Sequence, residues 1–205
     1  MLVDRSVRDL IAAFASADPT PGGGSASALA STVGASLLQM VASLPKTRSG
    51  SAEERAALTQ AGAALGELRG QLLEAIDADT AAYDQVVAAY KLPRATPDEQ
   101  QARKAAIQRA LRAATDVPLG VMRLSARGLE EAEVVAACGQ GAAASDVGVA
   151  VALLRAGSHG AALNVDINLG SVSDAGYVES IRADRGRLEA GVAVSAERAS
   201  SLLRL

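Results

Sequence analysis

Three consecutive glycines, Gly22, Gly23 and Gly24, lead through Ser25 into a long apolar helical pattern. Two prolines just before them hold the chain extended, because a residue that precedes proline avoids the α region. Ser25 is placed to cap the helix. A helix start without side chains offers free backbone N–H groups to a polar or anionic ligand. The sequence therefore predicts a ligand site here, with the alternative that the glycines only let two helices pass closely.

Asp79 is the second group that could do chemistry, because it interrupts an apolar stripe that advances in steps of three and four residues. The stripe consists of Leu65, Leu68, Leu72, Ile76, Asp79, Tyr83, Val86 and Tyr90. Desolvation in such a stripe raises the pKa of a carboxyl group, unless a cation or hydrogen-bond donors offset it. The group can then act as a general acid or base. The alternative is a structural aspartate that accepts hydrogen bonds from a neighbouring helix start.

A second glycine-containing turn, residues 139–144, precedes Ser145 and Asp146. We expect Ser145 to be the N-cap of the next helix and Asp146 to lie in its first turn. One ridge of that helix carries Asp146, Ala150, Leu153, Gly157, Gly160, Asn164 and Asn168. Asp146 and Asn164 are about 27 Å apart along it, so they cannot line one small pocket in a single chain. If both touch a ligand, they belong to different sites or different subunits; otherwise the asparagines close helix contacts.

The order and spacing of these motifs resemble the cyclodeaminase domain of the formiminotransferase-cyclodeaminase family, including its stand-alone methenyltetrahydrofolate cyclohydrolases. The similar segments are PGGGSASALASTVGASLLQMV, Asp79-Thr80-Ala81-Ala82-Tyr83, Leu92-Pro93, Thr96-Pro97, Val117-Pro118-Leu119, Ser145-Asp146, Gly160-Ala161, Asn164-Val165 and Asn168-Leu169. They cover nearly the whole chain.

The resemblance implies a single all-α domain over residues 1–205, an antiparallel helical bundle that pairs into a homodimer. It implies a folate enzyme that hydrolyses 5,10-methenyltetrahydrofolate to 10-formyltetrahydrofolate by general acid-base catalysis, without a metal or a further cofactor. Cyclohydrolase is favoured because the chain carries no formiminotransferase domain. The alternatives are a formiminotetrahydrofolate cyclodeaminase that releases ammonia, and a folate-binding paralogue without catalysis.

The resemblance also assigns site residues. Asp79 and Asp146 are the catalytic candidates, and the substrate-binding candidates are Gly22, Gly23, Gly24, Ser25, Lys46, Tyr83, Ser145 and Asn164. Tyr83 either stacks on the pterin or packs. A glutamate tail on the folate calls for basic side chains, for which the loops offer Lys46, Arg48, Lys91 and Arg94. Many relatives carry asparagines where this chain has residues 139–142, and their absence is the reason for the paralogue alternative.

Composition points to the same fold class. Hydrophobic residues make up 49% of the 205 residues but aromatic residues only 2%, so small side chains must pack closely approaching helices. A formal net charge of -3 argues against nucleic acid as the main partner. One cysteine and one histidine exclude an internal disulfide and the common zinc sites. We find neither a signal core nor an 18-residue apolar run, which predicts a cytoplasmic protein without a membrane partner.

The expected helices cover residues 6–16, 25–44, 51–90, 96–138, 145–169 and 175–203. Pro118 either kinks the fourth helix or divides it. Beside its large apolar stripe, the second helix carries Ser27, Ser31 and Ala35 at four-residue spacing. Because small residues let backbones approach, we expect this helix to be central.

Overall fold

The computed structural model describes residues 1–203, and within them the secondary structure is helical apart from one isolated bridge between Thr47 and Gly139. The α-helices are α1 (Val7–Phe14), α2 (Gly23–Ala42), α3 (Ala52–Tyr90), α4 (Pro97–Cys138), α5 (Ala144–Leu169) and α6 (Ala175–Ser201). Two short 3-10 helices, η1 (Leu2–Asp4) and η2 (Gly141–Ala143), accompany them. The all-α prediction is confirmed.

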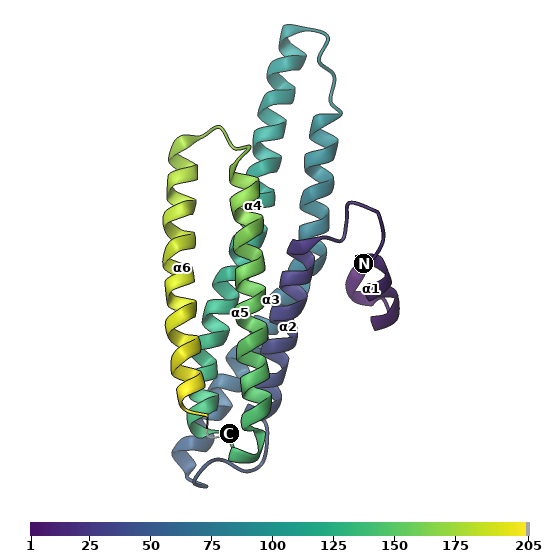
Figure 1. Ribbon diagram of the computed structural model, residues 1–205. Coiled ribbons are helices and arrows are strands. Elements are labelled where there is room, and N and C mark those ends of the chain that lie inside the picture. The colour runs from purple at the N-terminus through teal and green to yellow at the C-terminus, as the bar shows by residue number, and fades with distance from the viewer. Residues whose placement is uncertain (204–205) are drawn as a thin grey trace.

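Four of the helices form the body of the bundle: α2 packs on α3 and α5, and α4 closes the square by packing on the same two helices. Helix α6 lies outside the square, mainly on α4 (Figure 1). Helices α3 and α4 extend past the start of α2 as a long hairpin, while α1 stands beside the bundle and buries no residue. Because α2 is the short member of the square, its start lies against the flanks of longer helices.

Local capping explains where several helices begin. Ser51 accepts a hydrogen bond from the backbone N–H of Glu54, and Asp174 caps α6 in the same way. Thr96 and Glu99 form a complete capping box at the start of α4. Pro118 lies inside an uninterrupted α4. These helix starts agree with the prediction, and α3 is continuous as expected.

Small side chains let α2 and α5 pack at close range. A Cβ added to Gly157 would lie 2.0 Å from the hydroxyl oxygen of Ser31, and one added to Gly34 would lie 2.9 Å from the carbonyl oxygen of Ala150. Such distances leave no room for a methyl group. The central position predicted for α2 is therefore confirmed.

Some large apolar side chains of α2 lie on the outside instead, although Leu38 and Val41 are buried. Val33 is 43% exposed and Met40 is 41% exposed, because the close contact with α5 selects the small-residue side of the helix for burial. We call the outward apolar surface of these two helices the α2–α5 face. Its large members are Val33, Leu37 and Met40 of α2 and Val149, Leu163 and Ile167 of α5.

Helix α2 corrects one expectation about apolar runs. It is long enough to cross a membrane, and an 18-residue window in it has a mean hydropathy of 1.3. The prediction that no such run exists was wrong, because serines and glycines dilute the leucines only partly. Over half of that window, 56%, is buried inside the bundle, so its apolar character mostly serves the core.

Candidate functional site

A cavity of about 400 Å³ opens where α2 begins, between the flanks of α3, α4 and α5. Its lining comprises Pro19, Thr20, Gly22, Gly23, Gly24, Asp79, Tyr83, Val86, Leu111, Ala114, Asn164, Ile167, Asn168 and Ser171. The size suits a small organic ligand. The helix start and the carboxylate predicted from the sequence as separate candidates therefore share one cavity.

The N-cap of α2 is Gly22, with extended backbone at φ -121° and ψ -158°, and the helix begins at Gly23. The prediction that Ser25 caps this helix was wrong. Ser25 lies in the first turn, where its hydroxyl lies 2.9 Å from the carbonyl oxygen of Ile76 on α3. The cap comes from another helix.

Asp79 of α3 supplies that cap. Its Oδ2 accepts hydrogen bonds from the backbone N–H of Ser25, at 2.8 Å, and from the hydroxyl of Ser25, at 3.0 Å. The structural alternative for Asp79, an acceptor at a neighbouring helix start, is thus present. The other oxygen, Oδ1, has no hydrogen-bond partner among residues 1–203. One oxygen fixes the carboxylate, which leaves the other available to a ligand.

Burial raises the pKa of the Asp79 carboxyl above its ordinary value, and the two hydrogen bonds from Ser25 oppose the rise only in part. A raised pKa brings a carboxyl group closer to the pH at which it can both take up and release a proton. Asp79 is therefore a carboxyl group held in place by Ser25, with a pKa that burial raises.

The glycines make room for polar side chains at the helix start. A Cβ on Gly24 would lie 2.0 Å from Oδ1 of Asp79, and one on Gly23 would lie 3.3 Å from Nδ2 of Asn164. The N–H groups of Gly23 and Gly24 make no backbone hydrogen bond within the described residues. Both functions proposed for the glycines, close approach and free donors, apply at this one place.

The two asparagines of α5 differ in what they do. Asn168 donates from Nδ2 to the carbonyl oxygen of Ala114 at 2.8 Å, which joins α5 to α4. Asn164 donates to the carbonyl oxygen of Gly160 on its own helix, at 2.8 Å, and borders the cavity beside Gly23. The role of closing helix contacts therefore falls to Asn168.

Tyr83 stands at the rim of the cavity, one helical turn beyond Asp79, and is 41% exposed. An aromatic ring so far exposed is not held by the core, so its face is open to a planar ligand. Sequence reasoning did not select Thr20 and Ser171, two hydroxyl side chains that also border the cavity. Thr20 lies within the proline-containing approach to the glycines, a signal that could have found it.

Lys46, Ser145 and Asp146 lie at the opposite end of α2. Helices α2 and α5 are antiparallel, with Gly23 beside Asn164 and Gly34 beside Ala150. The start of α5 therefore lies near the end of α2, far from Asp79. Ser145 is not an N-cap as predicted: η2 runs directly into α5, whose N-cap is Ala143, without a side-chain cap.

The remaining basic candidates lie in two different loops, one after α2 and one between α3 and α4. Arg48 donates from Nη2 to the carbonyl oxygen of Ala136, at 2.6 Å. Its backbone N–H donates to the carbonyl oxygen of Cys138. It fixes the loop after α2 and is not free for a ligand. Lys91 and Arg94 are exposed between α3 and α4, at the tip of the hairpin.

Comparison with known proteins places these features in a family. A formiminotransferase-cyclodeaminase family model matches residues 6–187. The chain is 39% identical over 179 residues to a methenyltetrahydrofolate cyclohydrolase of Methylorubrum extorquens, with 87% of this chain and 86% of that protein covered. It is 32% identical to the formimidoyltransferase-cyclodeaminase of Sus scrofa, where the match covers 88% of this chain but 34% of that protein.

The fold agrees. A crystal structure of formiminotetrahydrofolate cyclodeaminase from Thermotoga maritima superposes with a TM-score of 0.88 and 26% identity, over 99% of this chain and 98% of that chain. The Asp79 cavity and the glycine-rich start of α2 thus occur in a bundle whose relatives are named for cyclohydrolase and cyclodeaminase activities. The chain belongs to the formiminotransferase-cyclodeaminase family.

Proposed function

We propose that this protein is a folate one-carbon enzyme that hydrolyses 5,10-methenyltetrahydrofolate to 10-formyltetrahydrofolate. The observation that carries the proposal is Asp79, whose Oδ2 is held by Ser25 while Oδ1 is left free in the cavity. The Methylorubrum extorquens protein, similar in length and named for this reaction, supports the choice of cyclohydrolase. A cyclodeaminase is the second candidate, favoured by the Thermotoga maritima structure.

The proposed chemistry uses Asp79 twice. As a carboxylate it stabilises the cationic methenyl carbon and accepts a proton from the water that attacks it. A C–O bond forms and the carbon becomes tetrahedral. The bond from that carbon to N5 then breaks and N5 takes the proton from Asp79, while the hydroxyl on the carbon releases its proton to solvent as the C=O bond forms, so the formyl group stays on N10. General acid-base transfer of this kind contributes about 10² to 10⁴ in rate.

The remaining groups of the cavity bind and orient the substrate. The free N–H groups of Gly23 and Gly24 and the amide of Asn164 supply hydrogen bonds to polar atoms of the folate. Tyr83 offers its exposed ring to the pterin. The substrate is then the only small molecule that the reaction requires besides water.

We further propose that the protein forms a homodimer through the α2–α5 face. No charged residue occurs from position 22 to position 45, so the exposed side of α2 is entirely without charge. Val149, Leu163 and Ile167 continue the apolar surface on α5, and Ile167 is 74% exposed. A surface of this kind on a folded chain calls for a partner, and a two-fold axis lets the same face serve both subunits.

The dimer would bring the end of α2 in one subunit close to the start of α2 in the other. A two-fold axis across the middle of α5 makes this helix antiparallel to its copy, so that its start meets the end of the partner's helix. Asp146 and Asn164 are about 27 Å apart in one chain. An axis midway between them places each of these positions beside the other one in the partner helix. We therefore propose that Ser145, Asp146 and Lys46 act on the substrate bound in the other subunit, with Asp146 close to Asn164 of the partner subunit.

The test follows the absorbance of 5,10-methenyltetrahydrofolate against its spontaneous hydrolysis. Wild-type protein should accelerate the loss, and Asp79→Asn should reduce the acceleration at least about 100-fold. Asp84→Asn is the matched control, because Asp84 is an exposed carboxylate on the same helix. If wild-type protein does not exceed the spontaneous rate, the cyclohydrolase proposal fails. Turnover of the formimino derivative would then indicate the cyclodeaminase, and binding without turnover the non-catalytic paralogue.

A further inference from the structure

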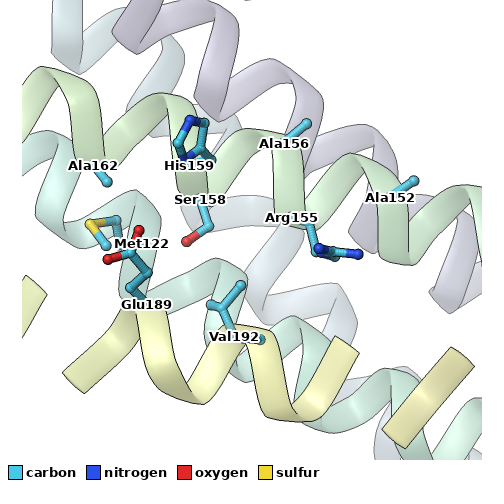
Figure 2. A pocket seen from close by; sticks show the side chains of 10 residues that line it. Met122, Ala152, Arg155, Ala156, Ser158, His159, Ala162, Glu189 and Val192 are labelled. Carbon is cyan, nitrogen blue, oxygen red and sulfur yellow. The ribbon is translucent and has the colours of Figure 1, made fainter. Parts of the chain in front are cut away.

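A second cavity, of about 430 Å³, lies between α5 and α6, with Met122 of α4 at its base (Figure 2). It shares no residue with the Asp79 cavity. It exists because α6 packs mainly on α4 and leaves α5 partly uncovered. Its volume falls in the range of small-molecule sites, and nothing in the proposed folate chemistry uses it.

Ser158 of α5 is the feature that marks this cavity as more than a packing gap. The residue is 2% exposed, yet its hydroxyl has no hydrogen-bond partner within residues 1–203. Several other helical serines bond the carbonyl oxygen four residues earlier, as Ser36 and Ser200 do at 2.7 Å. Figure 2 shows the Ser158 oxygen directed toward the space beside Met122. A hydroxyl that forms no hydrogen bond within the protein and borders a cavity is available to a ligand.

The charges around the cavity indicate which ligand it would take. Glu189 of α6 is already paired, because it accepts a hydrogen bond from Nη1 of Arg185 at 2.6 Å. Arg155 lies on the α5 wall, three residues before Ser158, and forms no ion pair in the part of the chain that the structure describes. A guanidinium group and a hydroxyl on one wall are donors, which suit a carboxylate.

Apart from the imidazole of His159 on α5, the rest of the lining is apolar. Met122 and Val192 are buried, and alanines such as Ala162 and Ala193 complete the walls. We propose that this cavity binds a small carboxylate with an apolar body, whose carboxylate accepts hydrogen bonds from Arg155 and Ser158 while the body packs on Met122 and Val192. This site is separate from the folate site and does not depend on the proposed function.

Three probes with the same apolar body test the proposal: hexanoate, hexylamine and hexan-1-ol, titrated into the full-length protein by calorimetry. Hexanoate should bind, hexan-1-ol should bind more weakly, and hexylamine should not bind, since Arg155 repels its charge. Arg155→Gln and Ser158→Ala should each weaken hexanoate binding about tenfold, the usual loss for a hydrogen bond to a charged group.

Two further variants separate this cavity from any other site. Ala193→Phe places a ring in the groove from an exposed position and should abolish binding. Arg182→Gln removes an exposed arginine of α6 that does not line the cavity, and binding should be unchanged. Circular dichroism establishes that each variant is folded. Absence of hexanoate binding, equal binding of hexylamine, or full affinity in Arg155→Gln and Ser158→Ala would each overturn the proposal.

Discussion

The two ends of α2 are both polar, but they use their polar groups differently. At its end, Arg48 and Arg55 donate to main-chain carbonyl oxygens, and Glu54 accepts from the hydroxyl of Thr47 at 2.6 Å. Every one of these groups is engaged by its neighbours. At its start, Asp79 keeps one oxygen free beside two backbone N–H groups that make no backbone hydrogen bond in the described chain. The difference teaches that a polar cluster can bind a ligand where some of its hydrogen-bonding groups have no partner within the protein.

The same difference appears in how the two carboxyl groups titrate. Hydrogen bonds from Thr47 and Ser49 lower the pKa of Glu54 to about 2, so that end favours the charged form. Burial raises the pKa of Asp79, so the start of α2 disfavours the charged form relative to an exposed aspartate. A carboxylate that is satisfied by its own loop contributes to the fold, whereas one that is desolvated gains reactivity.

The largest effect should come from glycine substitutions that test the two ends against each other. Gly24→Ala should reduce hydrolysis about 100-fold, because its Cβ would occupy the position of the Asp79 carboxylate and displace it. Gly141→Ala, at the opposite end, meets no atom within 4 Å and should keep full activity. Steady-state kinetics of the two variants measure this. Equal loss in both would show that the start of α2 has no special role.

A smaller loss is expected from the far end. Asp146→Asn should lower kcat/KM about tenfold, because one charged hydrogen bond to the substrate in the other subunit is lost. Glu130→Gln, an exposed acid on α4, is the control and should be silent. An Asp146→Asn enzyme with wild-type kcat/KM would confine the site to the Asp79 end and remove Asp146 from the proposal.

Stability should depend on pH with opposite sign at the two ends. The folded-state pKa of Asp79 lies above its ordinary 3.8, so its contribution is most favourable below pH 3.8 and is lost as the pH rises through the folded-state value. Asp79→Asn removes this titration. The Tm of wild-type protein relative to that of Asp79→Asn should therefore fall as the pH is raised from 3.8 toward neutrality; a constant difference would contradict the raised pKa.

Glu54 should have the smallest effect on stability, with a pH dependence opposite to that of Asp79. Its pKa is lowered from 4.5 to about 2, so its contribution is present above pH 4.5 and is lost as the pH falls toward 2. Glu54→Gln should lower the Tm slightly at neutral pH, since this glutamate is only partly buried, and the difference from wild type should vanish in acid. Thermal unfolding by circular dichroism across this range measures both variants. A deficit that persists at pH 2 would mean that packing and not charge is lost.

Local sequence signals predicted where several of the helices begin. The caps at Ser51, Thr96 and Asp174 are set by side chains within four residues of the helix start, so the sequence contains all that is needed to find them. Asp79 could be identified because it is the one charged residue in an otherwise apolar helical stripe. The long distance between Asp146 and Asn164 followed from helix geometry alone.

Long-range contacts account for what was missed. Ser25 is not the N-cap because Asp79, distant in sequence, occupies that role from another helix. Val33 and Met40 of α2 are exposed because the close packing on Gly157 of α5 selects the opposite, small-residue side for burial. That Asn164, and not Asp146, joins Asp79 depends on the antiparallel pairing of α2 with α5. None of these choices is encoded within one helical segment.

Mixing two impaired variants tests the central claim, that the end of α2 in one subunit meets the start of α2 in the other across a dimer. Asp79→Asn and Asp146→Asn would be unfolded together and refolded as an equal mixture. In a mixed dimer one site carries both substitutions and the other carries neither, so hydrolysis should recover to about a quarter of the wild-type rate. Recovery no greater than the average of the two variants alone would contradict a shared site and leave the Asp79 cavity to act within a single chain.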